Sequence, residues 1–115
     1  MKKIEIADWR QLKDKQPFAA RVSNVDLVVV RYNDNVSVLY GRCAHRGALM
    51  ADGHISGDNI ICGVHGWDYR FDTGVSEYNN SETLDKFSSW IEQDKVWVDQ
   101  DEILAWEREH PQPYA

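Results

Sequence analysis

Both cysteines of this chain and two of its four histidines lie in two short segments whose residue types could bind a metal. Cys43 and His45 form a Cys-x-His pair, and Cys62 and His65 form a Cys-x-x-His pair, with residues 46–61 between them. Thiolate sulfur and imidazole nitrogen are soft or borderline donors that suit transition metals. Four such donors in two short segments therefore predict a metal site.

The mixed composition of each pair distinguishes between two kinds of metal site. A structural zinc site usually takes two cysteines from one segment and two histidines from another. A Rieske [2Fe–2S] cluster instead has two cysteines on one iron and two histidines on the other. Cys43 and Cys62 are then expected on the inner iron, with His45 and His65 on the outer iron, so that each loop clamps both irons. A zinc-stabilised binding module stays open as an alternative.

A glycine follows each pair at the point where the chain must turn around the bulky sulfides of a cluster. These residues are Gly47 and Gly66. Glycine adopts left-handed backbone conformations readily, allows a close approach, and leaves N–H groups free to point at sulfur. Both glycines are therefore expected to support the cluster-binding loops, which we place at about 42–50 and 61–70.

The sequence around these pairs resembles the Rieske iron–sulfur domains. The similar stretch, residues 25–74, includes Cys-Ala-His-Arg-Gly-Ala and His-Gly-Trp-Asp-Tyr-Arg-Phe-Asp-Thr-Gly. The second phrase is most similar to the Rieske ferredoxins and Rieske domains of bacterial ring-hydroxylating oxygenase systems. The respiratory branch of the family adds a second cysteine to each loop to form a disulfide. This chain has only Cys43 and Cys62, so the resemblance points away from that branch.

Two aromatic residues after the second pair bear on the reduction potential that the resemblance implies. Trp67 stands where high-potential relatives place a serine hydroxyl, while Tyr69 could donate a hydrogen bond to a cysteine sulfur. Hydrogen bonds to sulfur set where a Rieske centre falls within roughly −150 to +300 mV. Because one donor is lost, we expect a midpoint below zero, and a value above about +150 mV would contradict this.

Composition and charge narrow the class of protein. The chain has 115 residues, 43% of them hydrophobic and 28% charged, which predicts one soluble domain over residues 1–109. Residues 110–115 are expected to be a tail or the start of a linker. The formal net charge of −6 argues against nucleic-acid binding. The longest apolar run, residues 27–30, is too short to cross a membrane, and the few cysteines favour the cytoplasm.

The pattern of residues predicts short antiparallel strands with one C-terminal helix. Strands are expected over 3–7, 25–32 with its hairpin partner 36–40, 60–61, 67–71, and 86–91 with 95–98. A helical turn capped by Asp8 and a helix over 101–109 capped by Asp101 complete the prediction. The expected fold is an all-β antiparallel sandwich or small barrel with a cluster-binding hairpin subdomain.

A complete oxygenase would need a second iron site, built from two histidines and a carboxylate. Outside the two pairs only His54 and His110 remain, and we expect both at the surface. The chain is therefore not expected to be an enzyme by itself.

The resemblance implies a soluble one-electron carrier that passes electrons from a flavin-containing reductase to a terminal oxygenase. The alternative is a Rieske domain or small subunit of a larger oxidoreductase, either fused to a flavoprotein or similar to the small subunit of nitrite reductase.

Overall fold

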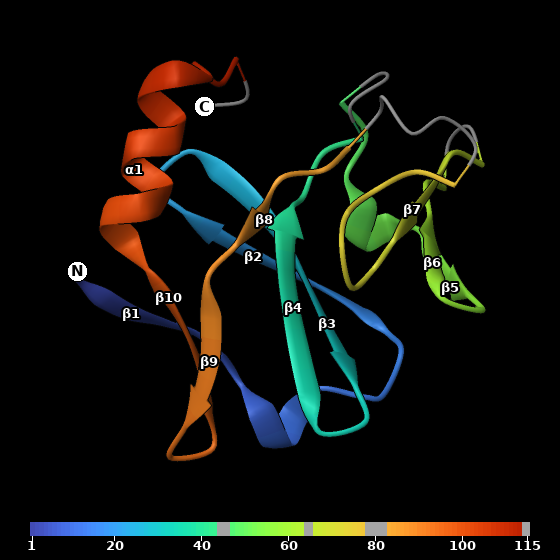
Figure 1. The fold of residues 1–115 in the computed structure, drawn as a ribbon, viewed down its shortest axis with the longest axis horizontal. Coiled ribbons are helices and arrows are strands. Elements are labelled where there is room, and N and C mark those ends of the chain that lie inside the picture. The colour runs from blue at the N-terminus through green and yellow to red at the C-terminus, as the bar shows by residue number, and fades with distance from the viewer. Residues whose placement is uncertain (44–46, 64–65, 78–82, 114–115) are drawn as a thin grey trace.

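The computed structural model describes residues 1–43, 47–63, 66–77 and 83–113, which form three antiparallel sheets and one α-helix (Figure 1). The all-β antiparallel architecture with a C-terminal helix, expected from the sequence, is confirmed. Within the described ranges the sheets stay open and do not close into a barrel, so the small-barrel form of the prediction is wrong.

The first sheet joins the two ends of the chain. Its strands, in spatial order, are β1 (Lys3–Asp8), β10 (Lys95–Asp99) and β9 (Ser89–Glu92). Strand β1 leads into a short 3-10 helix, η1 (Trp9–Gln11), whose predicted cap is confirmed because the Asp8 carboxylate accepts a hydrogen bond from the Arg10 N–H at 3.0 Å.

The central sheet carries the chain to the first of the two cysteine loops. Its strands, in spatial order, are β2 (Pro17–Val22), β3 (Val25–Tyr32), β4 (Asn35–Tyr40) and β8 (Lys86–Phe87). The β3–β4 hairpin is confirmed, with Asn33 at φ 56° in the turn. Strand β2 was not predicted. It begins at Pro17 and lies at the sheet edge, where the missing N–H of a proline is tolerated.

The single strand predicted over 86–91 is two strands that belong to different sheets. Strand β8 pairs with β4 in the central sheet, and β9 pairs with β10 in the first sheet. Ser88 lies between them, and its N–H donates to the Glu102 carboxylate at 2.8 Å. No glycine or proline marks a break at Ser88, so the change of pairing partner is not visible in the sequence.

The third sheet builds the predicted hairpin subdomain around the second cysteine loop. Its strands, in spatial order, are β5 (His54–Ser56), β6 (Asn59–Ile61) and β7 (Asp68–Arg70), preceded by the 3-10 helix η2 (Met50–Asp52). The turn between β5 and β6 lies at Gly57 and Asp58, where Gly57 adopts φ 60°, and Asn59 already pairs in β6.

Helix α1 (Gln100–Glu109) lies on the opposite side of the molecule from the third sheet (Figure 1). The prediction of Asp101 as its cap was wrong: the Asp99 carboxylate accepts the Asp101 N–H at 3.0 Å. Ile103 is fully buried, while Trp106 packs against the same apolar cluster from its edge.

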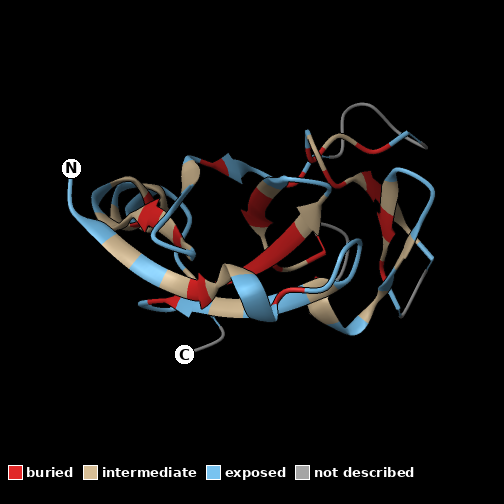
Figure 2. Ribbon diagram, turned by 90° about the horizontal axis from the view of Figure 1, so that it is seen from below, coloured by how far each residue is buried: buried red, intermediate tan, exposed pale blue. Residues whose placement is uncertain are grey.

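The inner strands of the central sheet, β3 and β4, are buried on both faces, and buried residues run through the middle of the molecule (Figure 2). Leu27 and Val29 of β3 face a core shared with the first sheet and α1, whereas Val28 and Val30 face a second core shared with the cysteine loops. A strand buried on both faces is apolar at successive positions, which explains the run at 27–30. Both cysteine loops therefore pack directly on the central sheet.

Candidate metal centre

The first cysteine loop leaves the end of β4 and closes on itself through two backbone hydrogen bonds. The Cys43 N–H donates to the Ala48 carbonyl at 2.8 Å, and the Gly47 N–H donates back to the Cys43 carbonyl at 2.7 Å. Gly47 adopts φ 73°, in the left-handed region. The turn therefore requires a residue such as glycine at this position.

The second cysteine loop, between β6 and β7, repeats this arrangement. The Cys62 N–H donates to the Trp67 carbonyl at 2.8 Å, and the Gly66 N–H donates to the Cys62 carbonyl at 2.9 Å. Gly66 has φ 68°. Both loops thus have the same hydrogen-bonding frame, with cysteine at its base and a left-handed glycine four residues later.

Both cysteines lie inside the second core. Cys43 is 2% exposed and Cys62 is 1% exposed, and neither forms a disulfide. They belong to one buried cluster with Met50, Ile60 and Tyr69. Two buried thiols at equivalent places in matching loops fit the sulfur half of a two-cysteine, two-histidine cluster.

The remaining expected site residues are placed as follows. The Tyr69 hydroxyl lies 3.7 Å from Cys43 Sγ, within reach of a hydrogen bond to sulfur, and the residue is fully buried. Trp67 is half-buried and packs against the same cluster. His45 and His65 lie outside the described residues.

Close backbone packing fixes the second loop against the segment that follows η2. A Cβ atom on Gly53 would lie 1.9 Å from the Ile61 carbonyl oxygen, and one on Gly63 would lie 3.0 Å from the Asp52 carbonyl oxygen. The segment that follows η2 therefore lies directly against the chain around Cys62. Sequence reasoning missed this role of Gly53, because Ile61 lies against it only once β5 and β6 have paired.

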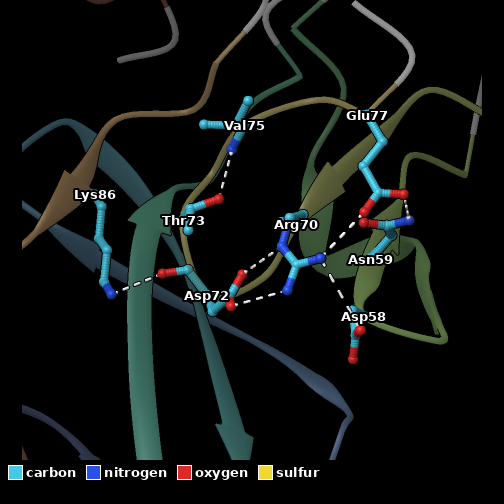
Figure 3. Close-up of polar contacts among 8 residues, drawn as sticks. All are labelled: Asp58, Asn59, Arg70, Asp72, Thr73, Val75, Glu77 and Lys86. Atoms are coloured by element: carbon cyan, nitrogen blue, oxygen red, sulfur yellow. Dashed lines mark hydrogen bonds and ion pairs between the residues drawn. The ribbon is translucent and has the colours of Figure 1, made fainter. Parts of the chain in front are cut away.

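An ion-pair network braces the third sheet below the loops (Figure 3). Arg70 binds both carboxylate oxygens of Asp72, at 3.0 and 3.1 Å, and also Glu77 at 3.1 Å. These contacts lower the pKa of the Asp72 carboxyl, while hydrogen bonds from Asn59 and then Arg70 lower the pKa of Glu77. Lys86 of β8 donates to the Asp72 carbonyl at 2.7 Å and so connects the network to the central sheet.

Asp26 and Arg42 are functional candidates that sequence reasoning also missed. Arg42 lies directly before Cys43, and its guanidinium contacts the Asp26 carboxylate at 2.9 Å. Asp26 is only 8% exposed. A lone carboxylate at the start of the apolar run of β3 was the available signal, since buried charges need a partner.

The fold and these loops define a small β-protein with two matching turns, each with a buried cysteine at its base. The model of the Rieske [2Fe-2S] domain family matches residues 2–88, so the chain belongs to that family. Its members carry a [2Fe–2S] cluster held by two cysteines and two histidines, and this is the cofactor implied here.

Known proteins of two sizes are similar to the chain. The ferredoxin of Sphingomonas yanoikuyae B1 superimposes with a TM-score of 0.77 at 25% identity, over 85% of this chain and 98% of that chain. A complex of reduced oxygenase and oxidised ferredoxin in carbazole 1,9a-dioxygenase gives a TM-score of 0.76 at 22% identity, over 85% of this chain and 93% of the matched chain, which shows the fold alone. Methylxanthine N1-demethylase NdmA of Pseudomonas putida is 40% identical over 53 residues, 46% of this chain and 15% of that protein.

The curated relatives are much longer than the chain, which spans between 13% and 26% of their length. Among the helices in the described residues, none combines the length and apolar character that a membrane crossing demands.

Proposed function

We propose that the chain is a one-electron carrier in which Cys43 and Cys62 bind one iron of a [2Fe–2S] cluster and His45 and His65 bind the other. The observation that carries the proposal is the pair of matching loops, each with a buried cysteine at its base. A structural zinc site usually takes two cysteines from one segment and two histidines from another. It does not require two matching loops with one cysteine each.

The chain contributes shielding, orientation and hydrogen bonding. Burial of Cys43 and Cys62 keeps water from their sulfurs. A deprotonated sulfur can only accept a hydrogen bond, so the Tyr69 hydroxyl donates to Cys43. When bound, a Rieske cluster takes up and returns one electron at a potential of roughly −150 to +300 mV. Gly47 and Gly66 have no side chain, so the two loops can turn close around the cluster.

The proposed donor is a flavin-containing reductase, and the proposed acceptor is a terminal oxygenase or another oxidoreductase in the cytoplasm. A reduced flavin holds two electrons, so each would be delivered to the carrier singly. The similar proteins described above include a ferredoxin in complex with its oxygenase and a demethylase, and they support an oxygenase as acceptor. The chain itself then performs electron transfer and no substrate chemistry.

An anaerobic titration of the purified chain tests the carrier role. Limiting amounts of a reduced flavin reductase are added, and the visible absorbance of the cluster is followed. We expect uptake of one electron per chain. Uptake of none by iron-loaded protein, or of two, would contradict a single one-electron centre.

A second candidate is a Rieske domain or small subunit of a larger oxidoreductase. The chain spans only 15% of the length of the demethylase, in which the similar stretch is part of a longer protein. This observation favours the second candidate. Gel filtration of the tagged chain from its native cells distinguishes the two functions. Co-elution with a flavin or sirohaem chromophore supports the subunit, and elution as a free small iron protein supports the carrier.

A further inference from the structure

The Arg42 side chain joins the first cysteine loop to the central sheet. Its Nε donates to Asp26 Oδ2 at 2.9 Å, and its Nη1 donates to the Gly47 carbonyl at 2.9 Å. The two side chains are only 19% and 12% exposed, so the ion pair is largely shielded from water. One guanidinium therefore connects a carboxylate on β3 with the left-handed glycine at the far side of the loop.

The backbone beneath this ion pair is equally constrained. The Gly41 N–H donates to the Asp26 carbonyl at 2.7 Å, and a Cβ on Gly41 would lie 2.7 Å from the Leu27 backbone. The Met50 N–H donates to the Gly41 carbonyl at 2.8 Å, where the chain returns from the loop. Asp26 is thus held at a fixed place below the loop, which makes it a rigid anchor for Arg42.

The second loop is anchored differently, although its internal hydrogen bonds match those of the first. Ile61 stands at the place equivalent to Arg42, directly before the cysteine. Its carbonyl oxygen lies so close to Gly53 that a Cβ on Gly53 would be only 1.9 Å away. Backbone packing thus anchors the second loop, while a charged side chain anchors the first.

We propose that Arg42 is a positioning residue for the cluster, which holds the first loop closed through Gly47 and balances its own charge against Asp26. This rests on the proposed function, because the loop matters for redox chemistry only if Cys43 and His45 are ligands. Loss of a partner outside the direct ligands commonly weakens metal binding by about ten- to a hundredfold.

The ion pair has two separable effects. Either half is needed to keep the loop closed, so losing either one releases the cluster faster. The two halves of the ion pair have opposite effects on the midpoint potential, because reduction adds one negative charge to the cluster. Removing Arg42 leaves the Asp26 carboxylate and lowers the midpoint potential, whereas neutralising Asp26 leaves the guanidinium and raises it.

The test uses Arg42→Gln, Arg42→Lys, Asp26→Asn and the double variant Arg42→Gln with Asp26→Asn. Arg21→Gln is the matched control, because Arg21 of β2 approaches the other oxygen of Asp26 at 3.8 Å and is more exposed, at 43%. Each loaded protein is measured for the rate of cluster loss to a chelator, the midpoint potential and the temperature of unfolding.

Arg42→Gln is expected to lose the cluster about tenfold faster than the wild type or Arg21→Gln. Its potential should fall, that of Asp26→Asn should rise, and the double variant should return close to the wild-type potential while still losing its cluster quickly. Arg42→Lys keeps the charge and should keep the potential, with an intermediate rate of loss.

Two results would overturn the proposal: cluster loss from Arg42→Gln no faster than from Arg21→Gln, or potentials that shift in the same direction in Arg42→Gln and Asp26→Asn. A wild-type protein that binds no cluster would instead refute the proposed function, so the two failures are distinguishable.

Discussion

Cys43 is the residue at which the chain acts most directly on the electronic properties of the proposed cluster. The residue is 2% exposed, and its sulfur lies 3.7 Å from the Tyr69 hydroxyl. A hydrogen bond to a sulfur ligand stabilises the more negative, reduced cluster and so raises the potential. Trp67 in place of a hydroxyl donor is expected to lower the potential, whereas the Tyr69 hydroxyl is expected to raise it.

Tyr69→Phe removes that hydroxyl and keeps the ring in the core. We expect the midpoint potential to fall by about 40 mV, which corresponds to about 1 kcal/mol for one electron. Redox titration followed by visible absorbance measures the shift. Tyr32→Phe, whose ring contacts Phe71 in the same core, is the matched control and should leave the potential unchanged. Equal potentials in all three proteins would mean that Tyr69 does not act on the sulfur.

His45→Cys and His65→Cys test the two proposed imidazole ligands. A thiolate in place of a neutral imidazole restores negative charge to the outer iron, so each variant should have a lower potential or lose the cluster. His54→Cys, on an exposed position of β5, is the control. Unchanged spectra and potential in His45→Cys or His65→Cys would show that the substituted histidine is not a ligand.

Ligand chemistry sets the types and spacing of the proposed site residues, so the sequence alone could point to them. The structure places the two cysteines and the two glycines in matching loops, while the histidine ligands stay a prediction. Arg42 could not be predicted, since an arginine beside a ligand is usually a solvated loop charge. Its role depends on Asp26, which lies sixteen positions away in sequence and reaches it only after β3 and β4 have paired.

At the level of elements, backbone contacts around Gly53 set the distance between η2 and the second loop. Gly53→Ala would place a methyl group 1.9 Å from the Ile61 carbonyl oxygen. We expect a loss of stability of about 2 kcal/mol or more, because the new methyl group would meet a backbone carbonyl, which cannot move aside as a flexible side chain can. Denaturant unfolding measures this.

Gly57→Ala is the control for the Gly53 substitution. An added Cβ there meets nothing within 4 Å, and only the φ of 60° is unfavourable. Its expected cost is about 1 kcal/mol. If Gly53→Ala proved no more destabilising than Gly57→Ala, the close packing of these elements would be wrong.

The Arg70 network predicts how the stability of the third sheet depends on pH. The folded-state pKa values of Asp72 and Glu77 lie below their ordinary values of 3.8 and 4.5. Their contribution is therefore fully present above those values and is lost as the pH falls through the lower folded-state values. Wild type should exceed Arg70→Gln in unfolding temperature at neutral pH, and the difference should shrink towards about pH 3.

Arg108→Gln, on the exposed side of α1, is the control for this pH dependence and should follow the wild type throughout. A difference between wild type and Arg70→Gln that stayed constant from about pH 7 to about pH 3 would show that these carboxylates do not contribute through Arg70.

Most elements could be predicted from alternation and turn residues, and the errors have a common physical cause. The break between β8 and β9 and the edge strand β2 depend on which strand each segment meets. The helix cap is Asp99 and not Asp101 because β10 runs directly into α1, and local sequence permits either residue. Pairing between strands that are distant in sequence decided each of these features, and the local residue pattern does not encode that pairing.

In the whole molecule, the central sheet separates two tasks. One face packs against the first sheet and α1, and the other supports both cysteine loops and the third sheet. The proposed cluster is therefore mounted on a strand pair that is buried on both sides. Such a mounting suits electron transfer, because a rigid site changes little in structure between its oxidised and reduced states.

The central claim is that this chain holds a Rieske cluster through Cys43, His45, Cys62 and His65. Electron paramagnetic resonance of the reduced protein, with iron and sulfide determined on the same sample, tests it most directly. We expect a red-brown protein with two irons and two sulfides per chain and the rhombic signal of a Rieske centre. Carefully handled protein that contained one zinc, no iron and no signal would contradict it.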